Sequence, residues 1–336
     1  MRSKVVALAA VLLAAPCGVA FGISINTFNQ IVSFGDSLSD PGNVSIATLG
    51  VFPGANYAAR TVAGVPFPVG YYTDGPNTTP GTGAGPTGLW IDQLATKMSL
   101  PDPGPTLAPA GGGTNYAVAS ALTGNTSQQD MQNQVNLFLS QHLTGASASA
   151  LYTFWGGAND LLGGNNPKQA ADNIFSQIRE VAADGGKYFL WLNLPSLGLT
   201  PEGSADAAAL NAASAAFNAE WSTDVSLLDS SGIYVIGVDV SSLFNQILAT
   251  PSAFGFTDVK DSAQGLSGVN PNNYLFWDDV HPTTAGDMYV ANLALADITA
   301  APEPASYVLI LLGGCGLLAL CGVKRKQPAD NKASVA

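Results

Sequence analysis

The sequence predicts an α/β domain in which helices cover a parallel β-sheet. Short runs rich in β-branched and aromatic residues alternate with segments of helical periodicity, which is the pattern of βαβ units. The runs are apolar at consecutive positions, as expected of strands that are buried on both faces. Five runs are the candidate strands: residues 31–34, 115–119, 151–155, 188–193 and 233–239.

Helical segments fall between these strands. Ser127 and Asp130 predict the N-terminal cap of a helix that ends near Leu143. Pro167 suits the first turn of a helix over residues 168–183, which two glycines terminate. Further helices are expected over residues 89–98, 205–228 and 284–298.

Composition excludes several classes of protein. With 336 residues, 47% hydrophobic and 11% charged, the chain can bury a large core and is not intrinsically disordered. Residues 23–301 hold 6 Lys and Arg against 22 Asp and Glu, a charge that repels nucleic acid. Cys17, Cys315 and Cys321 all lie in apolar terminal segments, so a cysteine nucleophile or a Cys-ligated zinc is excluded from residues 23–301.

The N-terminal segment has the three parts of a secretory signal peptide. Arg2 and Lys4 precede an apolar run over residues 5–15, and small residues follow it as far as Gly22. We expect residues 1–22 to be a signal peptide and residues 23–301 to form the exported domain.

The C-terminal segment predicts a second targeting signal. Residues 305–323 carry no charge and are long enough to span a bilayer, and the basic triplet 324–326 follows on the cytoplasmic side. With the Pro-Glu-Pro triplet 302–304, residues 302–326 resemble the PEP-CTERM sorting signal of Gram-negative bacteria. The resemblance implies transient membrane anchoring, processing by an exosortase-type enzyme, and a cell-surface, matrix or secreted location. Residues 327–336 are a polar tail.

Residues 73–113 are dense in Gly, Pro and Thr and predict a long loop that serves binding. Residues 83–88 match the dinucleotide-binding glycine pattern, but no strand precedes them and Pro86 interrupts them, so we reject this match.

The sequence has two histidines, and a general base working near neutral pH is most naturally one of them. His142 ends its predicted helix, where a structural role is favoured. His281 follows Asp278 by three residues, so on a tight turn the carboxylate can hold Nδ1–H and leave Nε2 free to take a proton. A plain surface turn, or a metal site that includes Asp279, is the alternative for this segment.

A serine that such a base can activate follows the first predicted strand. Gly35 permits a tight turn, and Ser37 then stands just beyond the carboxyl end of the strand, where nucleophiles of open α/β sheets lie. A simple turn is the alternative. Two other strand ends offer donors for an oxyanion, namely the side chain of Asn159 and the backbone N–H of Ser120, with the N–H of Ser37 as a third.

Together these segments resemble the GDSL esterase/lipase (SGNH hydrolase) family. Residues 34–40, 157–160 and 278–283 resemble its first, third and fifth sequence blocks in order and spacing. The resemblance implies a catalytic triad of Ser37, Asp278 and His281, and an oxyanion hole of Ser37, Ser120 and Asn159. In the second block, Ser120 stands where the family has a glycine, and its N–H serves if serine tolerates the backbone angle there.

The resemblance further implies a three-layer α/β/α sandwich around a five-stranded parallel sheet, similar to flavodoxin. It implies a secreted serine esterase that hydrolyses carboxylic esters through an acyl-serine, with no metal and no organic cofactor. Lipid, short acyl ester and acetylated polysaccharide remain open as the substrate. The alternative function is a catalytically silent surface or matrix binding protein on the same fold, which the acidic surface and the altered second block suggest.

Overall fold

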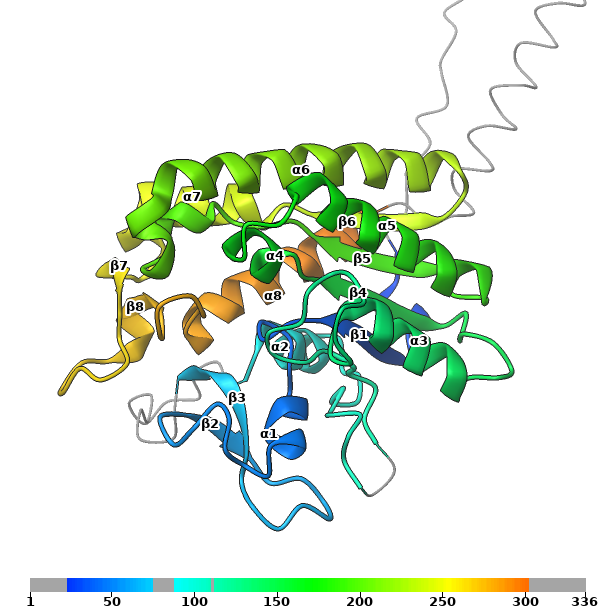
Figure 1. The fold of residues 1–336 in the computed structure, drawn as a ribbon, viewed down its shortest axis with the longest axis horizontal. Coiled ribbons are helices and arrows are strands. Elements are labelled where there is room, and N and C mark those ends of the chain that lie inside the picture. Colours follow the sequence, from blue (N-terminus) through cyan, green and yellow to red (C-terminus); the bar gives the residue numbers. More distant parts are fainter. Residues whose placement is uncertain (1–22, 75–87, 110–111, 302–336) are drawn as a thin grey trace, which may run out of the picture. The chain divides into compact units, whose positions relative to one another are not determined.

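Four parallel strands form the central sheet of the computed structural model, which describes residues 23–74, 88–109 and 112–301. Their spatial order is β1 (Gln30–Gly35), β4 (Ala150–Trp155), β5 (Tyr188–Leu192) and β6 (Tyr234–Val238) (Figure 1). All six residues of β4 are buried. The predicted parallel sheet is confirmed, and the apolar runs form its strands because both faces are covered.

The fifth predicted strand, residues 115–119, is reduced to isolated bridges at Asn115, one to Ser33 of β1 and one to Pro105. The segment still runs parallel to the outer edge of β1, since the N–H groups of Tyr116 and Val118 donate to the carbonyls of Ser33 and Gly35 at 2.8 and 3.2 Å. On its outer edge, the N–H of Asn115 donates to the Gly104 carbonyl at 3.2 Å and the Asn115 carbonyl accepts the N–H of Thr106 at 3.1 Å. Beyond Asn115, side chains of Asp40 and Asn43 bond the backbone of the segment. With this segment outside β1, the sheet has the strand order of flavodoxin-like folds.

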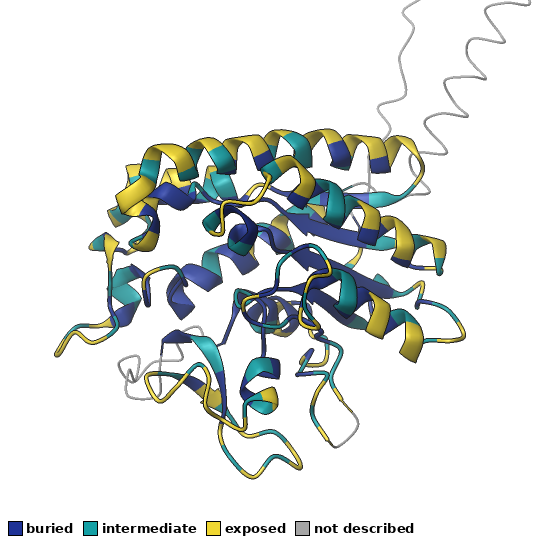
Figure 2. Ribbon diagram, viewed as in Figure 1, coloured by how far each residue is buried: buried dark blue, intermediate teal, exposed yellow. Residues whose placement is uncertain are grey.

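Helices cover the two faces of the sheet and complete the three predicted layers (Figure 1). On one face α5 packs against both α3 and α6, and on the other α2 packs against α8. The buried residues of these helices face the sheet, and their exposed residues face outward (Figure 2). Their bounds are α2 (Trp90–Lys97), α3 (Met131–Gln141), α5 (Pro167–Ala183), α6 (Ala207–Ser230) and α8 (Thr284–Ala300).

Helix α3 begins four residues later than the predicted cap. The carboxylate of Asp130 accepts hydrogen bonds from the N–H and the hydroxyl of Ser127, both at 2.8 Å, and from the N–H of Leu122 at 3.0 Å. These bonds stabilise a turn ahead of the helix, so the expected capping pair organises the approach to α3 and not its first turn.

Helix α7 (Val240–Ala249) was not predicted. It follows β6 directly, and the side chain of Asp239 caps it by accepting from the N–H of Ser242 at 3.0 Å. The signal was present in the apolar spacing of Val240, Phe244 and Ile247, which are all buried. The continuous apolar run that ends β6 obscured it.

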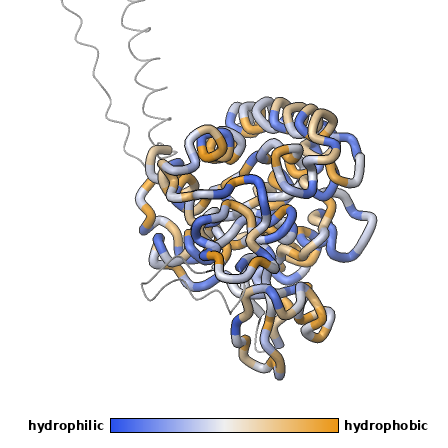
Figure 3. Tube along the Cα trace, turned by 90° about the vertical axis from the view of Figure 1, so that its left-hand side faces the viewer, coloured by the Kyte–Doolittle hydropathy of each residue, from blue (hydrophilic) through white to orange (hydrophobic). Residues whose placement is uncertain are grey.

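Several short elements were also not predicted from the sequence. A hairpin of β2 (Tyr57–Arg60) and β3 (Val69–Asp74) follows α1 (Asn43–Ala47), and the loops around it carry exposed hydrophobic residues (Figure 3). The remaining elements are α4 (Ala158–Leu162), β7 (Asp258–Ser262), β8 (Tyr274–Phe276), and the 3₁₀ helices Ile25–Thr27, Leu197–Leu199, Glu202–Asp206, Pro251–Phe254 and Pro271–Asn273.

The predicted signal peptide, the predicted sorting signal with its span over 305–323, and most of the rejected glycine motif at 83–88 lie outside the described residues. Within the described ranges, every helix is too short or too polar to cross a bilayer.

Candidate active site

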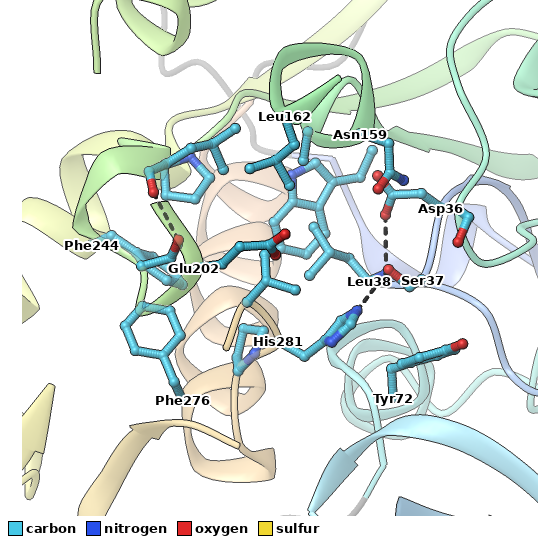
Figure 4. Close-up of a pocket in the computed structure, with 18 residues that line it drawn as sticks. Asp36, Ser37, Leu38, Tyr72, Asn159, Leu162, Glu202, Phe244, Phe276 and His281 are labelled. Carbon is cyan, nitrogen blue, oxygen red and sulfur yellow. Dashed lines mark hydrogen bonds between the residues drawn. The ribbon is translucent and has the colours of Figure 1, made fainter. Parts of the chain in front are cut away.

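Four of the five residues predicted to act together line one cavity of about 270 Å³ beyond the carboxyl ends of β1 and β4. Ser37 follows β1, Asn159 lies in the first turn of α4 after β4, and His281 lies just before α8. Ser120, at the end of the segment that runs along β1, also lines the cavity (Figure 4).

A continuous chain of hydrogen bonds joins a hydroxyl, an imidazole and a carboxylate. Ser37 Oγ lies 2.7 Å from His281 Nε2, and His281 Nδ1 lies 2.7 Å from Asp278 Oδ2. Because an ionised carboxylate only accepts, Nδ1 carries the proton and Nε2 accepts from the serine hydroxyl. His281 and Asp278 are both buried, at 7% and 9% exposure.

The Asp278–His281 segment is the tight turn that the sequence suggested. Asp278 Oδ1 accepts the N–H of His281 at 2.7 Å and the N–H of Val280 at 2.9 Å. The N–H of Trp277 donates to the His281 carbonyl at 2.8 Å, which closes the turn. The acid and the imidazole are thus fixed by their own backbone.

The environment keeps Asp278 ionised. Burial by itself raises the pKa of this carboxyl, but hydrogen bonds from the His281 side chain and from the N–H groups of His281 and Val280 outweigh it and lower the pKa to about 2. A permanent negative charge therefore faces His281 Nδ1, where it stabilises an imidazolium.

The turn after β1 presents Ser37 and excludes larger residues. A Cβ at Gly35 would lie 2.4 Å from the Trp155 carbonyl oxygen on β4, so only glycine fits there. Asp36 is buried, with Oδ1 accepting the N–H of Leu38 at 3.0 Å, while Oδ2 has no hydrogen-bond partner among the residues that the structure describes. Burial raises the pKa of Asp36 to about 7.

Gln134 on α3 supports the end of β1 and was not identified from the sequence. Its side-chain amide accepts from the N–H of Gly35 at 2.9 Å and donates to the carbonyl of Gly35 at 2.7 Å. The sequence carries no signal for this role, since an isolated glutamine on a helix is usually a surface residue.

Asn159 and Ser120, two of the three predicted oxyanion donors, differ in how their N–H groups are held. The amide of Asn159 donates one hydrogen to the Ala121 carbonyl at 3.1 Å, which orients the amide while its nitrogen retains a second hydrogen. Ser120 has a φ of 63°, in the left-handed region that favours glycine. The serine at the usual glycine position therefore keeps its N–H at the cost of backbone strain.

Side chains of the loop after Ser37 hold this strained segment. Asp40 accepts the N–H of Ala119 at 2.8 Å, and the amide of Asn43 donates to the carbonyls of Asn115 and Ala117 at 2.8 and 2.9 Å. The two loops that carry Ser37 and Ser120 are thereby joined to each other.

Two tyrosines of the β2–β3 hairpin also reach the chain of hydrogen bonds. Tyr57 donates its hydroxyl to Asp278 Oδ2 at 2.7 Å, and the ring of Tyr72 lies 4.7 Å from the ring of His281. Neither tyrosine can be identified from the sequence, because the contacts join segments more than 200 residues apart.

The other candidates lie elsewhere. His142 ends α3, where Nδ1 lies 2.8 Å from the Phe138 carbonyl and the ring stacks on Phe138, which is the structural role favoured above. Asp279, the second residue of the metal alternative, is exposed, and its carboxylate lies 3.5 Å from the Ser262 hydroxyl.

One group of three potential metal ligands lies close together among the described residues, and it is separate from His281. Asp172 on α5 and Glu220 and Asp224 on α6 bring one oxygen each within 4.8 Å of one another. Lys168 forms an ion pair with Glu220 there.

Comparison with known proteins extends this picture. The family model for GDSL-like lipase/acylhydrolase matches residues 31–294. A phosphatidylcholine-sterol acyltransferase of Aeromonas hydrophila is 26% identical, over 76% of this chain and 86% of that protein. A Pseudomonas putida protein from the trpE–trpG intergenic region is 27% identical over 86% of this chain. The match spans only 51% of the length of that protein.

A shorter match is to the esterase EstA of Pseudomonas aeruginosa, 29% identical over 46% of this chain and 27% of that protein. The family match covers both ends of the hydrogen-bonded chain, from the strand before Ser37 to the helix after His281. The chain therefore belongs to the GDSL-like lipase/acylhydrolase family.

Proposed function

We propose that Ser37, His281 and Asp278 are the catalytic triad of this serine hydrolase, which acts on carboxylic ester bonds. The observation that carries the proposal is the unbroken chain Ser37 Oγ–His281 Nε2 and His281 Nδ1–Asp278 Oδ2, with 2.7 Å at each contact. Both distances lie within the range for a nucleophile and its base.

In the proposed reaction, Ser37 Oγ attacks the acyl carbon of the ester and its proton passes to His281 Nε2. Asp278 stabilises the imidazolium. When the tetrahedral intermediate collapses, the ester C–O bond breaks and His281 gives the proton to the leaving alcohol. Water then attacks the acyl-serine with His281 again as base, which releases the acid and restores Ser37.

We infer that the N–H groups of Ser37 and Ser120 and the amide of Asn159 stabilise the oxyanion. All three residues line the cavity that holds Ser37 Oγ. Fixed donors in a site that excludes water are worth much more than donors in solution, because they need no reorganisation during the reaction.

We propose that the ester carries an uncharged apolar acyl group. Leu162, Leu197, Phe244 and Phe276 line the cavity, and among the described residues Glu202 is the one acidic residue there besides Asp36 (Figure 4). Such walls favour hydrocarbon and disfavour anionic groups. This agrees with relatives named as an acyltransferase of phosphatidylcholine and as an esterase. The alternative of a silent binding protein gains no support from a site with its hydrogen bonds intact.

We further propose that the protein is exported and released or anchored at the cell surface, on the basis of the two terminal segments described above.

Replacing Ser37 should abolish ester cleavage. We expect Ser37→Ala to lower kcat for p-nitrophenyl acyl esters by about 10⁴-fold or more, since triad members act as a unit. A phenylmethylsulfonyl-type reagent should label the wild type at Ser37. Ser176→Ala, an exposed serine on α5, is the control and should retain activity. Cleavage by Ser37→Ala at the wild-type rate would refute the assignment.

Removing the Asn159 amide should slow the chemical step. We expect Asn159→Ala to lower kcat by about 100-fold with a small change in KM, because the donor acts mainly on the charge that develops in the transition state. Steady-state kinetics against the control Asn165→Ala, an exposed residue just after α4, would measure this. Equal rates in the two variants would exclude Asn159 from the oxyanion hole.

Asp36 should make the fold less stable as the pH rises. Its folded pKa is about 7 because of burial, against about 3.9 in an unfolded chain. The unfolded state thus loses this proton first, and the free energy of unfolding falls between about pH 4 and 7, by at most about 4 kcal/mol. We expect Asp36→Asn to gain stability over the wild type across this range.

Urea unfolding at several pH values would measure the difference. Asp229→Asn, at an exposed position on α6, should differ from the wild type by a constant amount. A pH-independent difference for Asp36→Asn would contradict the assigned burial effect.

Export should leave a shortened chain. In a Gram-negative host with an exosortase, intact-mass analysis should find a protein that begins after residue 20 or 22 and ends near the 302–304 triplet, recovered outside the cytoplasm. A cytoplasmic protein that retains Met1 would count against the proposal.

A further inference from the structure

We propose that Tyr57 is a positioning residue for the reaction, which acts on His281 through Asp278. The inference rests on the proposed triad and adds a fourth member supplied by the β2–β3 hairpin. The Tyr57 hydroxyl and His281 Nδ1 both lie 2.7 Å from the same atom, Asp278 Oδ2.

The hydrogen bonds to Asp278 divide evenly between its oxygens. Oδ1 takes the two backbone N–H groups of its own turn, and Oδ2 takes the imidazole and the Tyr57 hydroxyl. A carboxylate offers about four acceptor positions, so Tyr57 fills the last of them. With the Tyr57 hydroxyl in place, each oxygen of the carboxylate accepts two hydrogen bonds.

The hairpin is attached firmly enough to hold this geometry. Asp74, at the end of β3, accepts from the N–H and the hydroxyl of Thr284, and the Thr73 hydroxyl donates to the Pro282 carbonyl at 3.1 Å. These contacts lie one and three residues after His281. The hairpin therefore contacts the chain just after His281, and it also contacts the carboxylate of Asp278, three residues before His281.

Tyr72 adds a packing contact from the neighbouring strand. Its ring lies over His281 with centroids 4.7 Å apart, and it meets the ring of Tyr57 edge-on at 5.4 Å. The imidazole thus packs against Tyr72, which in turn packs against Tyr57. The hydroxyl that reaches the carboxylate belongs to Tyr57.

Toward Asp278 the Tyr57 hydroxyl acts as the hydrogen-bond donor. Burial and the charge of Asp278 raise the pKa of this phenol, so it stays protonated throughout the working range of pH. Its hydrogen bond draws charge from Oδ2 and moderates the attraction of the carboxylate for a protonated His281. The other titratable groups near the pair are Tyr72, Asp36 near His281 and Asp40 near Tyr72.

The test is Tyr57→Phe, which removes one hydroxyl and keeps the ring. We expect kcat for a p-nitrophenyl acyl ester to fall about 10-fold, because the variant loses the charge-assisted hydrogen bond that positions the carboxylate. KM should stay within about twofold. The acid limb of the kcat/KM profile should move to higher pH, because Asp278 then holds the imidazolium more strongly.

Tyr71→Phe is the matched control, since Tyr71 lies on β3 of the same hairpin and faces Arg60 outside the cavity. It should leave kcat and the pH profile as in the wild type. Wild-type kcat and an unmoved acid limb in Tyr57→Phe would overturn the proposal. So would equal losses in both variants together with a lowered thermal midpoint, which would indicate a merely structural role.

Ser37→Ala, measured in parallel, separates the inference on Tyr57 from the proposed triad. If Ser37→Ala is inactive and Tyr57→Phe behaves as the wild type, the inference on Tyr57 fails and the triad stands. If Ser37→Ala remains active, the triad fails, and the positioning role of Tyr57 fails with it.

Discussion

The site depends on one imidazole that is engaged at both nitrogens. His281 contacts an acid three residues away and a hydroxyl 244 residues away, each at 2.7 Å. The contact with Asp278 is secured locally, because this acid also accepts the backbone N–H groups of the turn. The contact with Ser37 requires the whole α/β sheet to bring the end of β1 to the start of α8.

Several buried polar side chains around the site hold the segments that make the contact between Ser37 and His281 possible. Gln134 pairs with the backbone of Gly35, and Asp40 and Asn43 hold the segment along the outer edge of β1. These side-chain bonds hold the segment that leads to Ser120, where the backbone has a positive φ. Strain of this kind costs about 1–2 kcal/mol and persists only where the surroundings enforce it.

The sequence was sufficient where the signal is local. Consecutive apolar residues identified β1, β4, β5 and β6, and the spacing of Asp278 and His281 identified a turn that the structure contains. Prediction was weaker where one local signal overlaps another, as at α7, or where a strand is reduced to isolated bridges, as at residues 115–119. It failed for Gln134, Tyr57 and Tyr72, because their partners are fixed by tertiary structure and leave no periodic trace.

If Ser37 is the nucleophile, as we propose, its oxygen becomes covalently acylated during turnover. The most direct measurement is peptide mass spectrometry of the enzyme quenched within milliseconds of mixing with a p-nitrophenyl acyl ester. The account predicts that the peptide containing Ser37 gains the mass of the acyl group, in proportion to a burst of nitrophenol. Turnover with no adduct, or an adduct on a different residue, would contradict it.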